Sequence, residues 1–141
     1  MKKYLVIGNP IEHSLSPKLH NFWMKKNNIN AIYEKEKILD SDLKDLIAKV
    51  QKGEISGINV TVPFKKKVID YLDQLSIGSK ITQSVNTISL NGKNLIGYNT
   101  DIDGFELAIK NINFNVLNKK ILILGAGGVV SSIIFALKKL K

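Results

Sequence analysis

The stretch VNTISLNGKNLIGY, residues 85–98, decides the form of the sheet. Two apolar runs, 85–90 and 94–98, flank the pair Asn91-Gly92. Asn-Gly between such runs is the strongest short sequence signal for a β-hairpin. The sequence therefore predicts two antiparallel strands here, so one strand of the sheet runs against the others.

Strands and helices alternate on both sides of this hairpin. Upstream, strands are predicted at 4–7, 31–38 and 58–62, and each is followed by a helix, at 16–26, 40–53 and 63–75. Downstream, a helix is predicted at 101–113, then a strand at 121–124 and a helix to the end. This alternation predicts an α/β fold with a mostly parallel mixed sheet and helices on both faces.

Composition excludes several classes of protein. The 141 residues are 44% hydrophobic and 23% charged, as in a globular domain, and they contain no cysteine for a disulfide or a thiolate metal site. The only histidines, His13 and His20, have no cluster of acidic ligands beside them, so no metal is expected. The net charge is +9, yet every basic residue is lysine. Because nucleic-acid readers depend on arginine, a lysine-rich solvated surface is favoured over nucleic-acid binding.

No segment is typical of a signal peptide or a membrane span. The N-terminal apolar run is ended by Gly8, Asn9 and Pro10, and glycines and serines interrupt the apolar window at 121–137. The sequence therefore predicts a cytoplasmic protein that makes no membrane contact.

The motif GNPIEHSLSP, residues 8–17, follows the first predicted strand. It brings Ser14 and Ser16 to the start of a helix, where free N–H groups and the helix dipole suit a carboxylate or a phosphate. The alternative is structural: Ser16 caps the helix, and Pro17 occupies its first position.

The motif NVTVPFKKK, residues 59–67, ends another strand. Asn59 and Thr61 alternate along it and so share one face. Lys65 falls in the first turn of the helix predicted from Pro63, where a cation is electrostatically disfavoured, as a proton-transferring lysine requires. The alternative is that residues 65–67 form a solvated basic run.

Polar residues also follow the strands of the hairpin. Asn86 and Thr87 lie on its first strand, and Asn99, Thr100 and Asp101 lie where its second strand gives way to a helix. Polar side chains at the carboxyl ends of strands line the ligand sites of α/β sheets. Asp101 could equally serve as an N-cap or form an Asx turn.

The stretch ILILGAGGVVSS, residues 121–132, has the strand, glycine turn and helix of a dinucleotide-binding motif. The turn residues Gly125, Ala126, Gly127 and Gly128 would let the backbone approach a pyrophosphate at the helix N-terminus. Val130 stands where the third glycine of G-x-G-x-x-G is expected. A residue that selects the ribose would lie beyond the printed sequence.

With these motifs in this order, the chain resembles shikimate dehydrogenases along essentially its whole length. The matching segments are GNPIEHSLSP, GINVTVPFKKK, SVNTI, GYNTDIDGF and the GAGG turn. The resemblance implies reversible, NADPH-dependent reduction of 3-dehydroshikimate to shikimate, in the chorismate and aromatic amino-acid pathway. A quinate/shikimate dehydrogenase that uses NAD and a non-catalytic shikimate-binding module remain alternatives.

The resemblance also assigns roles to residues. It implies that Ser14 and Ser16 hold the substrate carboxylate, and that Lys65 is the catalytic lysine, paired with Asp101. It assigns the ring hydroxyls and the support of the pocket to a polar set: Thr61, Asn86, Asp101 and Asn59. The glycine turn at 125–128 would bind NADP.

Length is the main departure from the family, whose full enzymes carry roughly as much chain again. The sequence predicts a substrate-binding domain at 1–101, a connecting helix and linker at 102–119, and an incomplete start of an NADP-binding Rossmann domain at 120–141. We therefore expect a truncated chain that is inactive alone. The predicted strand at 121–124 would have unpaired edges, so we expect it either to pair with a second copy in a homodimer or to lack order.

Overall fold

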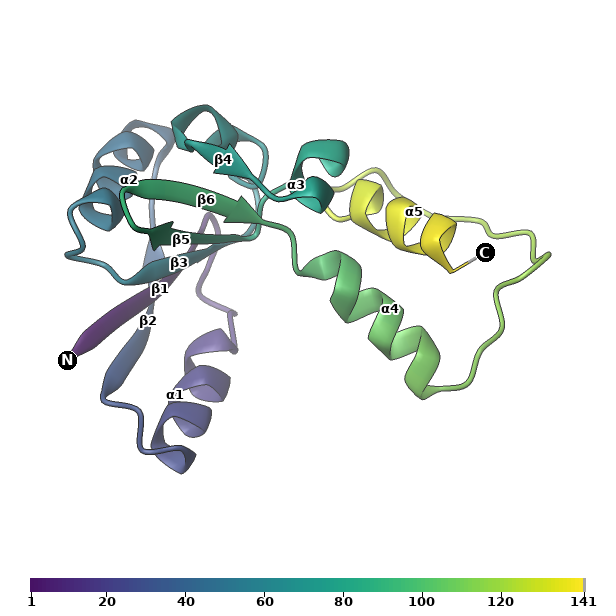
Figure 1. Cartoon of the computed structure of the whole chain (residues 1–141), viewed down its shortest axis with the longest axis horizontal. Helices are drawn as coiled ribbons and strands as arrows, with labels where there is room; N and C mark the ends of the chain where they lie inside the picture. Colours follow the sequence, from purple (N-terminus) through teal and green to yellow (C-terminus); the bar gives the residue numbers. More distant parts are fainter. Residues whose placement is uncertain (141) are drawn as a thin grey trace.

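The computed structural model describes residues 1–140, in which a single mixed sheet carries the fold (Figure 1). Its strand order is β2-β1-β3-β5-β6-β4. The strands are β1 (Lys2–Gly8), β2 (Ala31–Lys37), β3 (Gly57–Val60), β4 (Gln74–Leu75), β5 (Thr87–Asn91) and β6 (Asn94–Tyr98). β1 is parallel to β2 and β3, β4 is parallel to β6, and β5 is antiparallel to both of its neighbours. The predicted hairpin and the mixed α/β sheet are therefore confirmed.

The α-helices are α1 (Ser16–Lys26), α2 (Leu43–Gln51), α3 (Ile77–Thr82), α4 (Asp101–Asn111) and α5 (Val130–Lys139). Two 3-10 helices, η1 (Asp40–Asp42) and η2 (Lys67–Tyr71), complete the set. α1 and α2 cover opposite faces of the sheet, because alternate residues of β1 contact different clusters. Val6 packs in a cluster with Met24 of α1, whereas Leu5 packs in a cluster with α2. α4 and α5 lie side by side beyond one end of the sheet (Figure 1).

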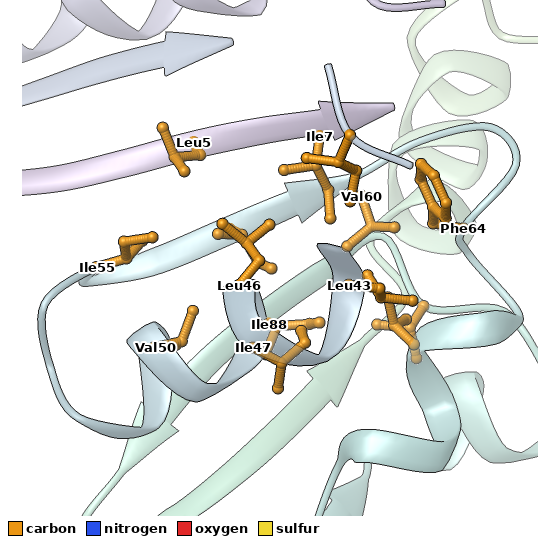
Figure 2. Packing of buried hydrophobic residues seen from close by; sticks show 14 of the residues in the cluster. Leu5, Ile7, Leu43, Leu46, Ile47, Val50, Ile55, Val60, Phe64 and Ile88 are labelled. Carbon is orange, nitrogen blue, oxygen red and sulfur yellow. The ribbon is translucent and has the colours of Figure 1, made fainter. Parts of the chain in front are cut away.

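The larger core cluster fills the space between the sheet and α2 (Figure 2). The buried residues of α2 have the spacing of one helical face: Leu43, Leu46, Ile47 and Val50. Burying each such side chain contributes about 1.5–3 kcal/mol. Phe64, 1% exposed, closes the cluster. It thereby anchors the segment that carries Lys65 to the core.

The predicted helix at 63–75 is wrong. Residues 62–66 form turns, η2 follows, and the chain then pairs with β6 through β4. Asp73 N donates to Leu95 O at 3.0 Å, and Ser76 N donates to Gly97 O at 2.9 Å. Hydrogen bonds to a distant strand therefore replace the local helix, although the apolar spacing suited one. The short helix α3 was not predicted.

The predicted strand at 121–124 is also wrong. Its residues have no regular secondary structure, and Leu122 and Leu124 are 84% and 87% exposed. A strand requires a neighbour for its backbone hydrogen bonds, and residues 1–140 offer none here. The helix expected after the glycine turn does form, as α5, and it packs against α3 and α4. No helix within residues 1–140 has the length and apolar character to cross a membrane.

Candidate active site

A cavity of about 290 Å³ lies where β1 and β3 end, lined by Val6, Pro10, Ile11, His13, Ser14, Ser16 and Thr61. Main-chain hydrogen bonds hold the two motifs around it, from Asn9 N to Val62 O at 2.9 Å and from Thr61 N to Ile7 O at 2.9 Å. A Cβ on Gly8 would lie 2.6 Å from Thr61 Cγ2. Glycine at position 8 is therefore required for the two motifs to come this close.

The two serines of the first motif both face this cavity. Ser16 is the first residue of α1 and Leu15 occupies the cap position, with no side-chain capping bond. The alternative of Ser16 as an N-cap is therefore wrong, because the helix begins one residue earlier than that alternative requires. Ser14 Oγ accepts a hydrogen bond from Ser16 N at 3.3 Å. Two hydroxyl groups and the start of a helix thus adjoin one cavity, an arrangement that suits an anion.

Lys65 and Asp101 form an ion pair across 36 residues of sequence, with Lys65 Nζ 2.6 Å from Asp101 Oδ2. The two side chains are 15% and 25% exposed. Lys66 and Lys67 are exposed, and Lys67 pairs with Asp40. The interpretation as a solvated basic run therefore applies to Lys66 and Lys67 only. Since no α-helix begins at Pro63, the proposed helix-dipole effect on Lys65 is absent.

Asp101 uses its carboxylate for contacts with Lys65 and Asn86 and not for helix capping. It is the first residue of α4, and Thr100 is the cap residue. The Asx turn belongs to Asn99, whose Oδ1 accepts from Asp101 N at 3.1 Å. Asp101 Oδ1 accepts from Asn86 Nδ2 at 2.9 Å. One carboxylate thus contacts an ammonium group and an amide, each on a different segment of the chain.

Asn59 lies at the centre of a hydrogen-bond network beside this pair. Its Nδ2 donates to Thr87 Oγ1 at 2.9 Å and to Asn86 O at 3.2 Å. Its Oδ1 accepts from the Tyr33 hydroxyl at 2.6 Å. Burial raises the pKa of Tyr33 to about 12, although a hydrogen bond with the Ser16 side chain works in the opposite direction. Sequence reasoning missed Tyr33, for which the only signal was the alternation within 31–38.

The glycine turn adjoins Lys65. A second cavity of about 430 Å³ is lined by residues of both: Val62, Pro63, Lys65, Lys66, Thr82, Gln83, Ser84, Gly128 and Ser131. Ser84 Oγ donates to Gly128 O at 3.2 Å. Buried Asn99 ties α5 to the rest of the molecule, since its Nδ2 lies 2.8 Å from Ser132 Oγ and 2.9 Å from Thr82 Oγ1. Within residues 1–140, no three potential metal ligands cluster.

These motifs gather where strands of an α/β sheet end, which is the position of a small-molecule binding domain's substrate site. The family model for the shikimate dehydrogenase substrate binding domain matches residues 6–88. This chain therefore belongs to the shikimate dehydrogenase family, and the resemblance stated from its motifs is confirmed.

Relatives and solved structures agree with this assignment. The NADP(+) shikimate dehydrogenase of Pelagibacter ubique is 59% identical over 140 residues, which cover 99% of this chain and 53% of the relative. Shikimate dehydrogenase 1 from Peptoclostridium difficile matches with a TM-score of 0.93 and 34% identity, over 99% of this chain and 53% of that one. The Thermus thermophilus enzyme in complex with NADP(H) and shikimate matches with a TM-score of 0.90 and 32% identity, over 99% and 52%. The chain spans about half the length of these proteins.

Proposed function

We propose that this chain supplies the substrate-binding half and the proton-transfer pair of an NADP-dependent shikimate dehydrogenase. The observation that carries the proposal is the 2.6 Å pair between Lys65 and Asp101. Asn86 donates a hydrogen bond to the carboxylate of this pair, and Thr61, four residues before Lys65, lines the cavity that the two serines face. The substrate is shikimate in one direction and 3-dehydroshikimate in the other, as the relatives' names and the Thermus thermophilus complex support.

Residues of the serine-lined cavity and residues of the ion-pair network bind different groups of the substrate. Ser14 and Ser16 hold the carboxylate, because two hydroxyl donors and the start of α1 face the same space. Thr61 and Asn86 bind the ring hydroxyls, together with Asp101. Asn59 supports the pocket through its hydrogen bonds to Tyr33, Asn86 and Thr87.

The chemistry assigned to Lys65 is proton transfer at the C3 oxygen of the substrate. As the carbonyl of 3-dehydroshikimate is reduced, its oxygen gains negative charge, and Lys65 donates the proton that neutralises it. In the reverse direction Lys65 accepts the proton of the hydroxyl. Asp101 holds the ammonium group in place and accepts a hydrogen bond from that hydroxyl.

The turn formed by Gly125, Ala126, Gly127 and Gly128 fits the phosphates of NADP. Gly125 has a φ of +112°, which favours glycine, and a Cβ placed on Gly125 or Gly127 would meet no atom within 4 Å. The turn leads into α5, whose first N–H groups suit an anion. When bound, NADPH supplies the hydride for the reduction.

We also propose the division into a substrate domain at 1–101, a connection at 102–119 and the beginning of the cofactor domain at 120–141. Within residues 1–140 that beginning consists of a turn and one helix, with no sheet to support them. We therefore expect these 141 residues alone to show no NADPH-dependent turnover of 3-dehydroshikimate. The homodimer through residues 121–124 stays a prediction, which now lacks the strand on which it was based.

Calorimetric titration with shikimate tests the substrate assignment. Ser14→Ala/Ser16→Ala should weaken binding by about a hundredfold or more, since each of the two lost hydrogen bonds to a charged group contributes about 1.5–3 kcal/mol. The matched control is Ser41→Ala, because Ser41 is exposed on η1 and bonds only to its neighbour Asp42. Equal affinity of the double variant and this control would contradict the proposal.

A further inference from the structure

Tyr33 is held rigidly on the face of the sheet that α1 covers. Its residue surface is 3% exposed, and its ring stacks on the imidazole of His20, with centroids 4.2 Å apart and planes 6° apart. Asn21 of α1 pairs with both main-chain groups of Tyr33, from Tyr33 N to Oδ1 at 2.9 Å and from Nδ2 to Tyr33 O at 2.7 Å. Since β2 is an edge strand, this amide takes the place of a neighbouring strand.

The hydroxyl of Tyr33 reaches across β1 to the centre of the site. Tyr33 is in register with Tyr4 on one side of β1, and Asn59 is in register with Val6 on the other. The hydroxyl nevertheless lies 2.6 Å from Asn59 Oδ1 and donates to it. A residue of the edge strand thus contacts the network around the ion pair directly.

Asn86 O, which can only accept, fixes which way the amide of Asn59 points, and the Tyr33 hydroxyl holds the oxygen end of that amide. With Oδ1 occupied by the hydroxyl, Nδ2 faces Asn86 O at 3.2 Å and Thr87 Oγ1 at 2.9 Å. A half-turn of the amide would place Oδ1 against Asn86 O. Both oxygens can only accept, so the hydrogen bond would be lost. The side chain of Asn86 in turn donates to Asp101 Oδ1. The orientation of one amide therefore bears on the position of the carboxylate that holds the lysine.

We propose that Tyr33 is a positioning residue of the substrate site, whose hydroxyl anchors the Asn59 amide and thereby holds Asn86 and Thr87 in place. The inference rests on the proposed function, because it deepens the account of the same site. Tyr33 acts through Asn59 and contacts no reacting atom.

Tyr33→Phe removes the hydroxyl and keeps the ring that stacks on His20. We expect its affinity for shikimate to fall about tenfold, as the loss of one buried hydrogen bond predicts. Tyr4→Phe is the matched control: Tyr4 packs against the same cluster, and the hydrogen bonds of Asn59 go to Tyr33, Asn86 and Thr87. In an Asn59→Ala background, adding Tyr33→Phe should cause a much smaller loss than in the wild type, because the two residues act in series and only the contact of the hydroxyl with the Ser16 side chain is left to lose.

Two measurements decide the matter, calorimetric affinity for shikimate and the NMR resonances of the Asn59 and Asn86 side-chain amides. These resonances should move in Tyr33→Phe and stay in place in Tyr4→Phe, whether or not ligand is present. A wild-type chain that does not bind shikimate overturns the proposed function, and this inference with it. A wild-type chain that binds, with equal affinity in Tyr33→Phe, overturns the inference alone. Unmoved resonances, or additive losses in the double variant, overturn it too.

Discussion

Replacing Asp101 by asparagine keeps the shape of the side chain and removes its charge. The change leaves Lys65 Nζ facing a neutral group where a carboxylate oxygen lay 2.6 Å away. At 15% and 25% exposure, the pair lies between a surface ion pair, worth about 0–1 kcal/mol, and a buried one, whose disruption costs about 3–5 kcal/mol. We therefore expect Asp101→Asn to lower the free energy of unfolding by about 2 kcal/mol, as measured by urea denaturation.

The matched control is Asp103→Asn, which removes the same charge from the same first turn of α4. Both variants lose a favourable interaction with the helix dipole, about 0.3–1 kcal/mol, so this contribution largely cancels in the difference. Asp103 is 76% exposed and its cation, Lys139, is 3.8 Å away, so its loss should stay within about 1 kcal/mol. Equal losses in the two variants would refute the reasoning, because Asp101 would then contribute only as a helix-terminal charge.

Two further predictions concern stability. Desolvation lowers the pKa of His20 below 6.5; the unfolded chain therefore takes up the proton first as pH falls, and stability should decrease below about pH 6.5. His20→Gln should reduce this dependence of stability on pH, as measured by thermal unfolding at a series of pH values. His13→Gln, at an exposed position, should leave the dependence unchanged. Ser132→Ala removes the hydrogen bond from Asn99 to α5. It should lower the free energy of unfolding by about 1 kcal/mol and speed amide hydrogen exchange at 130–139. The exposed neighbour Ser131 provides the control; equal exchange in Ser131→Ala would contradict the assigned anchor.

Local patterns predicted the elements whose structure depends on local interactions. The hairpin at 85–98 follows from Asn91-Gly92, and α2 follows from its apolar face. The prediction of a helix at 63–75 was wrong, because residues 73–76 hydrogen-bond to β6, some twenty residues further along the chain. The residues at 121–124 have strand composition but no strand beside them in residues 1–140. The local spacing of apolar residues does not show which distant segments will pair.

The candidate site shows the same division. Motifs singled out Ser14, Ser16, Lys65 and Asp101, and the structure brings the last two into contact. Sequence reasoning could not find Tyr33, because its bond to Asn59 spans an intervening strand and depends on sheet register.

The central claim is that four separate segments of this chain form one shikimate site. NMR titration of the isotope-labelled chain with shikimate tests it most directly. We expect the amide resonances of residues 14–16, 61–65, 86–87 and 100–101 to shift together and to saturate with a single affinity. The contradictory result is no shift at all, or shifts along the apolar groove of α1 at Lys18, Leu19 and Phe22 with none at 61–65, 86–87 and 100–101.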